Sequence, residues 1–226
     1  MVDYSDLKDK KVLVVGLART GVALSKFLVK LGAKVTVSDH KSKAELANFL
    51  EQMEGVDVEY DLGGHSPKTF LNQHLLILSP GISPNLKIFD YARSHGVKVT
   101  GEFEFASSFI QEPVVALTGT NGKTTVAKLT QMMLEESGVS TWIGGNFGPP
   151  LSEYLLMEDK VQIVIAEVSS FQLEHVEKFT PKNVVFTNLA EDHLDRYRSM
   201  EEYVNAKRKV FVNTNQATTS ILNADD

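Results

Sequence analysis

The fold is indicated most directly by the stretch Val114-Val115-Ala116-Leu117-Thr118-Gly119-Thr120-Asn121-Gly122-Lys123-Thr124-Thr125. Its first five residues are mostly apolar and show no in/out alternation, which is typical of a strand that is covered on both faces of a parallel sheet. A loop with two glycines follows, and a segment with helical periodicity begins at Lys123. This order of strand, glycine loop and helix predicts a phosphate-binding loop.

The loop has the parts that phosphate binding requires, although its first glycine lies three residues before Gly122, where the common pattern has five. The two glycines leave backbone amides free to line a phosphate, Lys123 offsets the charge of the β- and γ-phosphates, and the Thr124 hydroxyl can bind Mg²⁺. The alternative is an ordinary Gly-Asn turn before an exposed lysine. We predict that a nucleoside triphosphate binds at Gly119, Thr120, Asn121, Gly122, Lys123, Thr124 and Thr125.

Similar apolar runs alternate with helical segments along the whole chain. The expected strands are Val12–Val15, Lys34–Ser38, Leu75–Ser79, Val97–Thr100, Gln162–Val168 and Asn183–Thr187, and the expected helices include Gly21–Leu31, Ala44–Met53, Lys123–Ser137 and Met200–Phe211. Such alternation predicts an α/β fold on parallel sheets. We expect a Rossmann-like domain at residues 1–111 and a P-loop NTPase-like α/β domain at 112–226. Because Ser220–Asn223 reads as one more strand close to the last residue, we expect this second domain to be incomplete.

Composition excludes several classes of protein. The 226 residues carry a net charge of −6 and no long basic run, which disfavours a nucleic-acid partner. The absence of cysteine excludes disulfides and thiolate sites. The polar N-terminus does not resemble a signal peptide, and no apolar stretch approaches the ~20 residues that a membrane helix needs. We therefore expect a soluble cytoplasmic protein without membrane insertion.

A second anion-binding pattern lies near the N-terminus, at Val12-Leu13-Val14-Val15-Gly16-Leu17-Ala18-Arg19-Thr20-Gly21, and Asp39 follows 23 residues after Gly16. It resembles a dinucleotide fingerprint in which Ala18 replaces the middle glycine, and this replacement weakens the case for NAD. Two interpretations stay open. A nucleoside diphosphate could bind at the helix N-terminus, or the segment could be a plain βαβ turn that two glycines allow to pack.

Polar side chains follow two later strands, at the sheet edge where ligands of α/β proteins bind. Glu167 ends one of these strands and could hold Mg²⁺, or it could face solvent or pair locally. His193 follows the next strand, between Asp192 and Asp195. It could be a metal ligand that these carboxylates orient, or an ordinary surface or core histidine.

Lys207 lies in the middle of an apolar helical arc that is formed by Tyr203, Ala206, Val210 and Phe211. Burial of an ammonium lowers its pKa, and a neutral amine could react with carbon dioxide to give an anionic carbamate that binds metal. The alternative is that the side chain extends past its neighbours and keeps its charge in water.

Taken together, these segments resemble the Mur ligases of bacterial cell-wall synthesis over essentially the whole chain. The resemblance is carried by Thr118–Thr124, Glu167–Glu174, Ser79–Ile82, Gly144–Asn146, Glu191–Tyr197 and Asn223–Asp226. Within the family, Glu167-Val168-Ser169-Ser170-Phe171-Gln172-Leu173-Glu174 is most similar to the members that add D-glutamate to UDP-N-acetylmuramoyl-L-alanine. Folylpolyglutamate synthetases share the loop but lack a preceding domain like residues 1–111.

The resemblance implies a role for each matching residue. The uridine diphosphate would lie near Gly16, Leu17, Ala18, Arg19, Thr20, Asp39 and Gly81, and the muramoyl-alanine part near Asn146, Ser169 and Gln172. Thr124 and Glu167 would bind one Mg²⁺, and His193 with carbamylated Lys207 a second. The catalytic residues would be Lys123, His193 and Lys207.

The resemblance implies an ATP-dependent ligase that forms an amide through an acyl phosphate, in the synthesis of peptidoglycan precursors for the cell wall, cell shape and cell division. The family has a longer central domain and a C-terminal domain that binds the amino acid. We therefore expect this chain, as a monomer, to bind UDP-sugar ligands but not to ligate. The alternatives are another Mur ligase, a folylpolyglutamate synthetase-like ligase, an NAD-dependent oxidoreductase and a non-catalytic nucleotide-binding fragment.

Overall fold

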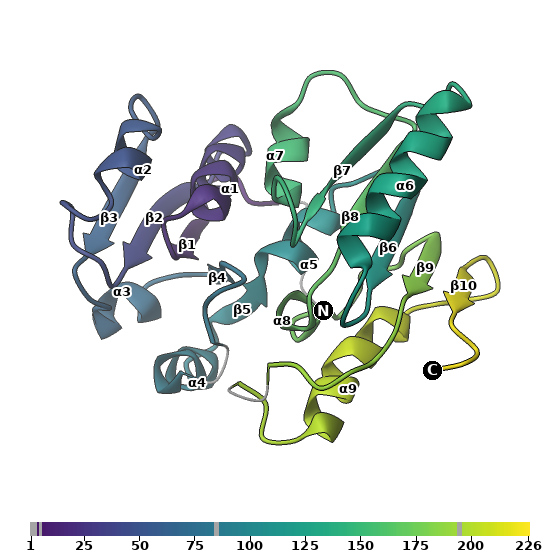
Figure 1. Cartoon of the computed structure of the whole chain (residues 1–226). Helices are drawn as coiled ribbons and strands as arrows, with labels where there is room; N and C mark the ends of the chain where they lie inside the picture. Colours follow the sequence, from purple (N-terminus) through teal and green to yellow (C-terminus); the bar gives the residue numbers. More distant parts are fainter. Residues whose placement is uncertain (1–3, 5, 84–85, 194–195) are drawn as a thin grey trace. The chain divides into compact units, whose positions relative to one another are not determined.

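The computed structural model describes residues 4, 6–83, 86–193 and 196–226 (Figure 1). The chain divides into two compact units, Met1–Ala106 and Ser107–Asp226, each with its own sheet. No helix of the described ranges has both the length and the apolar character that crossing a membrane would require.

The first unit contains a parallel five-stranded sheet with the order β3-β2-β1-β4-β5. The strands are β1 (Lys11–Val15), β2 (Lys34–Asp39), β3 (Val58–Leu62), β4 (Leu75–Leu78) and β5 (Lys98–Gly101). The strand order reverses beside β1, and in sheets of this kind the carboxyl ends of the strands at such a point form a ligand crevice.

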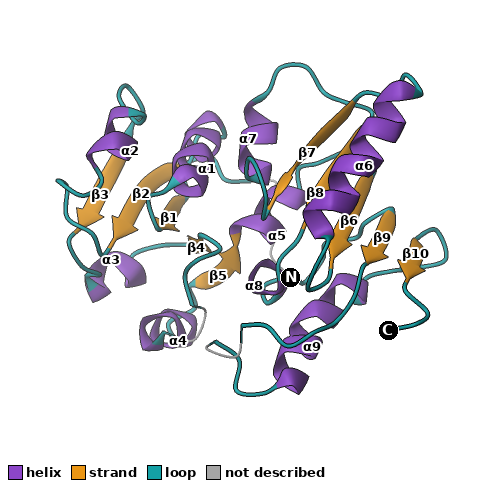
Figure 2. Ribbon diagram, in the orientation of Figure 1, coloured by secondary structure: helices purple, strands orange, loops and turns teal. Residues whose placement is uncertain are grey.

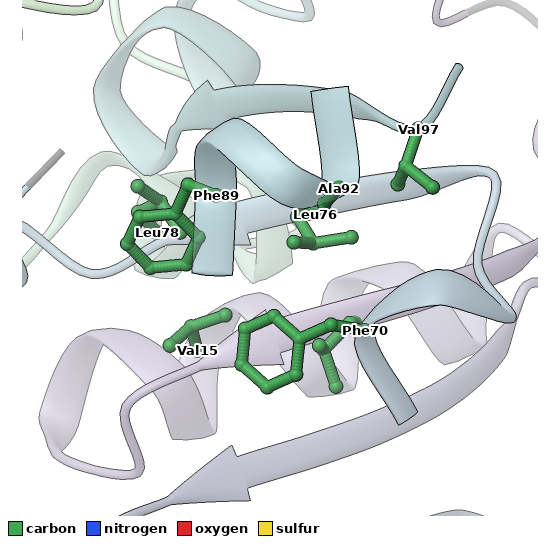
Figure 3. Packing of buried hydrophobic residues seen from close by; sticks show 8 residues of the cluster. Val15, Phe70, Leu76, Leu78, Phe89, Ala92 and Val97 are labelled. Atoms are coloured by element: carbon green, nitrogen blue, oxygen red, sulfur yellow. The ribbon is translucent and has the colours of Figure 1, made fainter. Parts of the chain in front are cut away.

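The helices of the first unit are α1 (Arg19–Lys30), α2 (Ala47–Glu51), α3 (Pro67–Leu71), α4 (Lys87–Ser94) and α5 (Glu102–Ser107). Figure 3 shows how the apolar side chains of β1 and β4 pack against those of α3 and α4. The Phe70 and Phe89 rings lie 6.0 Å apart in this core. Because the β1 and β4 side chains are buried in this core, the sequences of both strands are continuous apolar runs.

The second unit contains a parallel five-stranded sheet with the order β10-β9-β6-β8-β7. The strands are β6 (Val114–Thr118), β7 (Thr141–Gly145), β8 (Ile163–Glu167), β9 (Asn183–Phe186) and β10 (Thr219–Leu222). The helices are α6 (Lys123–Glu136), α7 (Leu151–Leu156), α8 (Ser170–Leu173) and α9 (Met200–Arg208), and α9 continues into a 3₁₀ turn at Lys209–Phe211. Helix α6 contacts β6, β7 and β8 (Figure 2).

The structure confirms the predicted α/β class with parallel sheets. It also corrects two details of the sequence analysis. Met200–Phe211 was expected as one helix, whereas the last three residues form the 3₁₀ turn. Strand β3 was not expected, because its sequence VEYDL is charged and lies at the sheet edge, where burial does not select for an apolar run.

Gly21 allows α1 to begin close to the end of β1. A Cβ atom added at Gly21 would lie 2.1 Å from the carbonyl oxygen of Gly16, whereas one added at Gly81 would meet no atom within 4 Å. We expect Gly21→Ala to lower the free energy of unfolding by about 1–3 kcal/mol, because the backbone must move. Gly81→Ala should change it by less than about 0.5 kcal/mol in urea unfolding followed by circular dichroism. Equal effects of the two substitutions would contradict this account.

Candidate functional site

The predicted phosphate loop joins β6 to α6 and depends on both of its glycines. Gly119 has φ +138° and Gly122 has φ +79°, and residues other than glycine rarely adopt such positive φ values. A Cβ at Gly119 would also lie 2.1 Å from the Thr187 hydroxyl oxygen, whereas a Cβ at Gly122 would meet open space. Gly119 is therefore required for both conformation and space, and Gly122 for conformation alone.

The middle of the loop is bonded to the segment that follows β9. The Thr120 N–H donates to the Asn188 carbonyl at 2.9 Å, and the Asn121 N–H donates to the Asn188 side chain at 2.8 Å. The Thr187 hydroxyl donates to the Asn121 carbonyl at 2.7 Å. These two loop amides are thus used within the protein, which differs from the expectation that the loop amides as a whole would be available to a phosphate.

The start of α6 remains a suitable place for an anion. Gly122 is its N-cap residue, and no side chain caps this end of the helix. Lys123 is the first residue of the helix, and its Nζ donates to the carbonyl oxygens of Gly119 at 3.0 Å and Thr120 at 2.8 Å. The first amides of a helix and a nearby lysine favour a phosphate group, because the helix dipole adds to the charge of the ammonium.

Glu167 lies beside the loop because β6 and β8 are neighbours, with Leu117 opposite Glu167. One carboxylate oxygen accepts the Thr124 hydroxyl at 2.7 Å, and the other accepts the Asn146 amide at 2.9 Å. The structure thus brings three predicted site residues into direct contact. Their oxygen atoms are of the kind that Mg²⁺ prefers.

Lys207 is buried, with 2 % of its surface exposed. Its Nζ donates to the Gly119 carbonyl at 2.7 Å and lies 4.7 Å from the centre of the Tyr203 ring. Burial, and then the charge of Lys123, lower the pKa of Lys207 to about 8. Roughly a tenth of an amine with this pKa is neutral at pH 7. The interpretation of an amine extended into water is therefore wrong, because the helix packs Lys207 inward.

His193 also lies near Tyr203, with 6.1 Å between the two ring centres. Its Nε2 is 3.4 Å from an Asp192 carboxylate oxygen. Asp195, the other carboxylate considered from the sequence, lies outside the described residues. Within those residues, no cluster of three or more histidine and carboxylate side chains could hold a metal. A metal bound by His193 would therefore need donors of other kinds, such as hydroxyl or carbonyl oxygen atoms.

Ser169 and Gln172, which the resemblance assigns to substrate contact, cap the N-terminus of α8. The Gln172 side-chain oxygen accepts the Ser169 N–H at 3.0 Å, and the Ser169 hydroxyl oxygen accepts the Gln172 N–H at 3.2 Å. Both residues are buried. In this structure the two side chains stabilise the helix start that follows Glu167.

In the first unit, the predicted diphosphate residues gather where β1, β2 and β4 end. An Asp39 carboxylate oxygen accepts the Leu17 N–H at 2.7 Å, and the Ser79 hydroxyl donates to the Gly16 carbonyl at 3.1 Å. Ala18 is the N-cap of α1, whose first residues are Arg19 and Thr20, and no side chain caps this end. Gly81 lies in the turn that follows Ser79. The arrangement again leaves a helix start suited to an anion.

The sequence analysis missed two residues that organise the site. Asn188 makes three hydrogen bonds to Thr120 and Asn121 in the middle of the loop, and its only sequence signal is a polar residue two positions after a strand. Tyr203 was interpreted only as an apolar residue of the helical arc. The shared face with Lys207 was predicted, but the Tyr203 hydroxyl, which lies 3.1 Å from the Thr120 hydroxyl, was not assigned a role.

Residues 10–101 match the family model "Mur ligase MurD-like, N-terminal domain", and residues 117–226 match "Mur ligase middle domain". A curated relative from Bdellovibrio bacteriovorus, named UDP-N-acetylmuramoylalanine--D-glutamate ligase, is 68% identical over 99% of this chain and 48% of its own length. A relative of the same name from Desulfatibacillum aliphaticivorans is 47% identical over 98% of this chain and 49% of its own length. The chain thus spans about half the length of these relatives.

Two solved structures share the fold. UDP-N-acetylmuramate:L-alanyl-gamma-D-glutamyl-meso-diaminopimelate ligase from Neisseria meningitides has a TM-score of 0.63 at 16% identity, covering 96% of this chain and 72% of that one. UDP-N-acetylmuramate-alanine ligase MurC from Thermotoga maritima has a TM-score of 0.55 at 21% identity, covering 96% and 50%. With both domain models matched in order along the sequence, the chain belongs to the Mur ligase family.

Proposed function

We propose that this protein adds D-glutamate to UDP-N-acetylmuramoyl-L-alanine in peptidoglycan precursor synthesis, with ATP as the energy source. The observation that carries the proposal is the 68% identity, over 99% of the chain, with the Bdellovibrio relative of that name. We further propose that the protein works as a monomer in the cytoplasm, where ATP and nucleotide sugars are available.

The two parts of the chain divide this work. Residues 1–111 bind the uridine diphosphate, and the uncapped start of α1 supports this role. Residues 112–226 bind ATP through Gly119–Thr125, with the phosphates at the start of α6. Lys123, which now donates to two loop carbonyls, exchanges them for phosphate oxygens. The muramoyl-alanine part binds near Asn146, Ser169 and Gln172. The polar atoms of these residues that make no hydrogen bond within the protein contact it.

Two sets of residues would hold Mg²⁺. The Thr124 hydroxyl and the Glu167 carboxylate, 2.7 Å apart, form the first set of oxygen donors. His193 and a carbamate on Lys207 would form the second; the His193 ring centre and the Lys207 Nζ lie 6.1 Å and 4.7 Å from the centre of the Tyr203 ring. In the carbamate, the neutral amine nitrogen bonds to the carbon of carbon dioxide and releases a proton to solvent. When bound, Mg²⁺ gathers the charge that builds up on a transferring phosphoryl group.

The reaction has two steps. A carboxylate of the alanyl group attacks the γ-phosphate of ATP, which gives an acyl phosphate and ADP. The amine of D-glutamate then attacks the acyl carbon, phosphate leaves, and the amine gives up a proton. Lys123 stabilises the transferring phosphoryl group through its positive charge, and the amides at the start of α6 orient it.

Ligase activity is tested in a chimera, in which residues 1–226 replace the matching part of the Bdellovibrio relative. We expect phosphate release that requires ATP, UDP-N-acetylmuramoyl-L-alanine and D-glutamate together. Lys123→Met should lower the rate by roughly 100-fold or more, because a charged group that stabilises the transition state is lost. Lys128→Met, on the exposed side of the same helix, serves as the control and should leave the rate unchanged. Release that depends on a different amino acid would overturn the proposal.

Substrate binding is tested by calorimetry on this chain alone. We expect UDP-N-acetylmuramoyl-L-alanine to bind saturably, UDP to bind more weakly and NAD not to bind. Asp39→Asn should weaken binding on the order of tenfold, since one charge-assisted bond that shapes the turn is lost. Asp90→Asn, an exposed change on α4, is the control. Binding of NAD with no uridine ligand bound would favour the oxidoreductase alternative.

The carbamate is tested by ¹³C NMR of this chain under a constant pressure of ¹³C-labelled carbon dioxide. Because the pKa of Lys207 is lowered to about 8, its neutral fraction rises as the pH increases through 8. We expect a carbamate signal that grows over that range and disappears in Lys207→Met. Lys209→Met should retain it. A signal that survives the loss of Lys207 would place the carbamate elsewhere.

A further inference from the structure

The backbone of His193 adopts an unusual conformation. Its φ is +54°, one of two positive values among the described residues other than glycine. Such a conformation costs on the order of 1–3 kcal/mol and persists only where the surroundings impose it. Contacts with neighbouring residues must therefore hold His193 in this conformation.

The first restraints come from the neighbouring backbone. The N–H groups of Arg196 and Tyr197 both donate to the His193 carbonyl at 3.0 Å. The His193 N–H donates to an Asp192 carboxylate oxygen at 2.8 Å. The conformation of His193 therefore depends on where Arg196 and Tyr197 are held.

One carboxylate holds both of these residues. Arg196 Nη2 donates to one oxygen of Glu174 at 2.8 Å, and the Tyr197 hydroxyl donates to the other at 2.6 Å. The Arg196 and Glu174 side chains are only 19% and 16% exposed, so water screens this pair weakly. Lys209 Nζ also donates to the Glu174 carbonyl at 2.5 Å, which ties α8 to the turn after α9. Glu174 thus joins the segment after β8 to Arg196 and Tyr197, whose N–H groups bond to His193.

Aromatic rings extend the same arrangement to the phosphate loop. The Arg196 guanidinium lies 4.0 Å from the centre of the Phe171 ring, and that ring lies 4.8 Å from the His193 ring. The ring centres of Tyr197 and Tyr203 lie 5.4 Å apart, and the Tyr203 hydroxyl is hydrogen-bonded to the Thr120 hydroxyl. Burial, and then Glu174, raise the pKa of Tyr197, so its hydroxyl remains a donor at physiological pH.

We propose that Glu174 is a positioning residue that holds His193 in its left-handed conformation, through Arg196 and Tyr197, and so fixes the imidazole beside Phe171 and Tyr203. Glu174 itself is not proposed to touch a ligand. Its consequence for the reaction rests on the proposed function, whereas its effect on His193 does not. A carboxylate is required because it is the acceptor for two donors from different residues, one of them charged.

The effect on His193 is measured by NMR of this chain without ligands. The Phe171 ring current should displace the His193 imidazole signals from those of an exposed histidine. In Glu174→Gln and Tyr197→Phe we expect these signals to move toward the exposed value, while those of His74 and His95 in the first unit stay unchanged. Glu136→Gln, an exposed change at the end of α6, is the matched control. His193 signals that stay fixed in both folded variants would overturn the proposal, and Tyr197→Phe keeps the test available if Glu174→Gln does not fold.

The effect on the reaction is measured in the ligase chimera. We expect Glu174→Gln to lower kcat on the order of tenfold to a hundredfold with the KM for ATP unchanged, because His193 is displaced while the phosphate loop is intact. Arg196→Lys, which keeps the charge, should be less impaired than Arg196→Met. Normal turnover in a Glu174→Gln chimera with displaced His193 signals would overturn the role in the reaction. An unmutated chimera without activity would instead count against the proposed function, and the NMR result would still decide how His193 is held.

Discussion

Two lysine side chains share one acceptor, the carbonyl oxygen of Gly119, and the candidate site depends on this contact. Lys123 reaches it from the start of α6, and Lys207 reaches it from α9. Because Lys207 is buried, and because the Lys123 ammonium is close, the pKa of Lys207 is lowered. Lys207 is thus distant from the phosphate loop in sequence but contacts it in the structure. Its lowered pKa leaves part of the amine neutral and able to react.

The parallel sheets explain why these groups meet. In each unit the polar residues follow strands that point the same way, so their side chains gather at one edge of the sheet. β6 delivers the loop, β8 delivers Glu167, and β9 delivers Asn188 beside them. The apolar strands set the spacing, and the residues just beyond them supply the polar contacts.

The sequence alone predicted those features that depend on a single physical requirement within a short segment. The apolar runs of buried strands and the glycine loop before Lys123 predicted the α/β fold and the position of the loop. Contacts between distant segments could not be predicted in this way. Nothing local in the sequence shows that Asn188 would take the amides of Thr120 and Asn121, or that Glu174 would join Arg196 and Tyr197. Edge strand β3 was missed because exposure removes the apolar pattern on which the prediction depends.

Strand β10 lies at one edge of its sheet, and all four of its residues are exposed, including Ile221 and Leu222. It pairs with β9 on one side. An edge that presents backbone donors and acceptors together with apolar side chains is adhesive toward other extended chains. Within these 226 residues, one row of β10 backbone groups and the side chains of Ile221 and Leu222 are therefore open to pairing with a further extended segment, two strands away from β6 in the sheet.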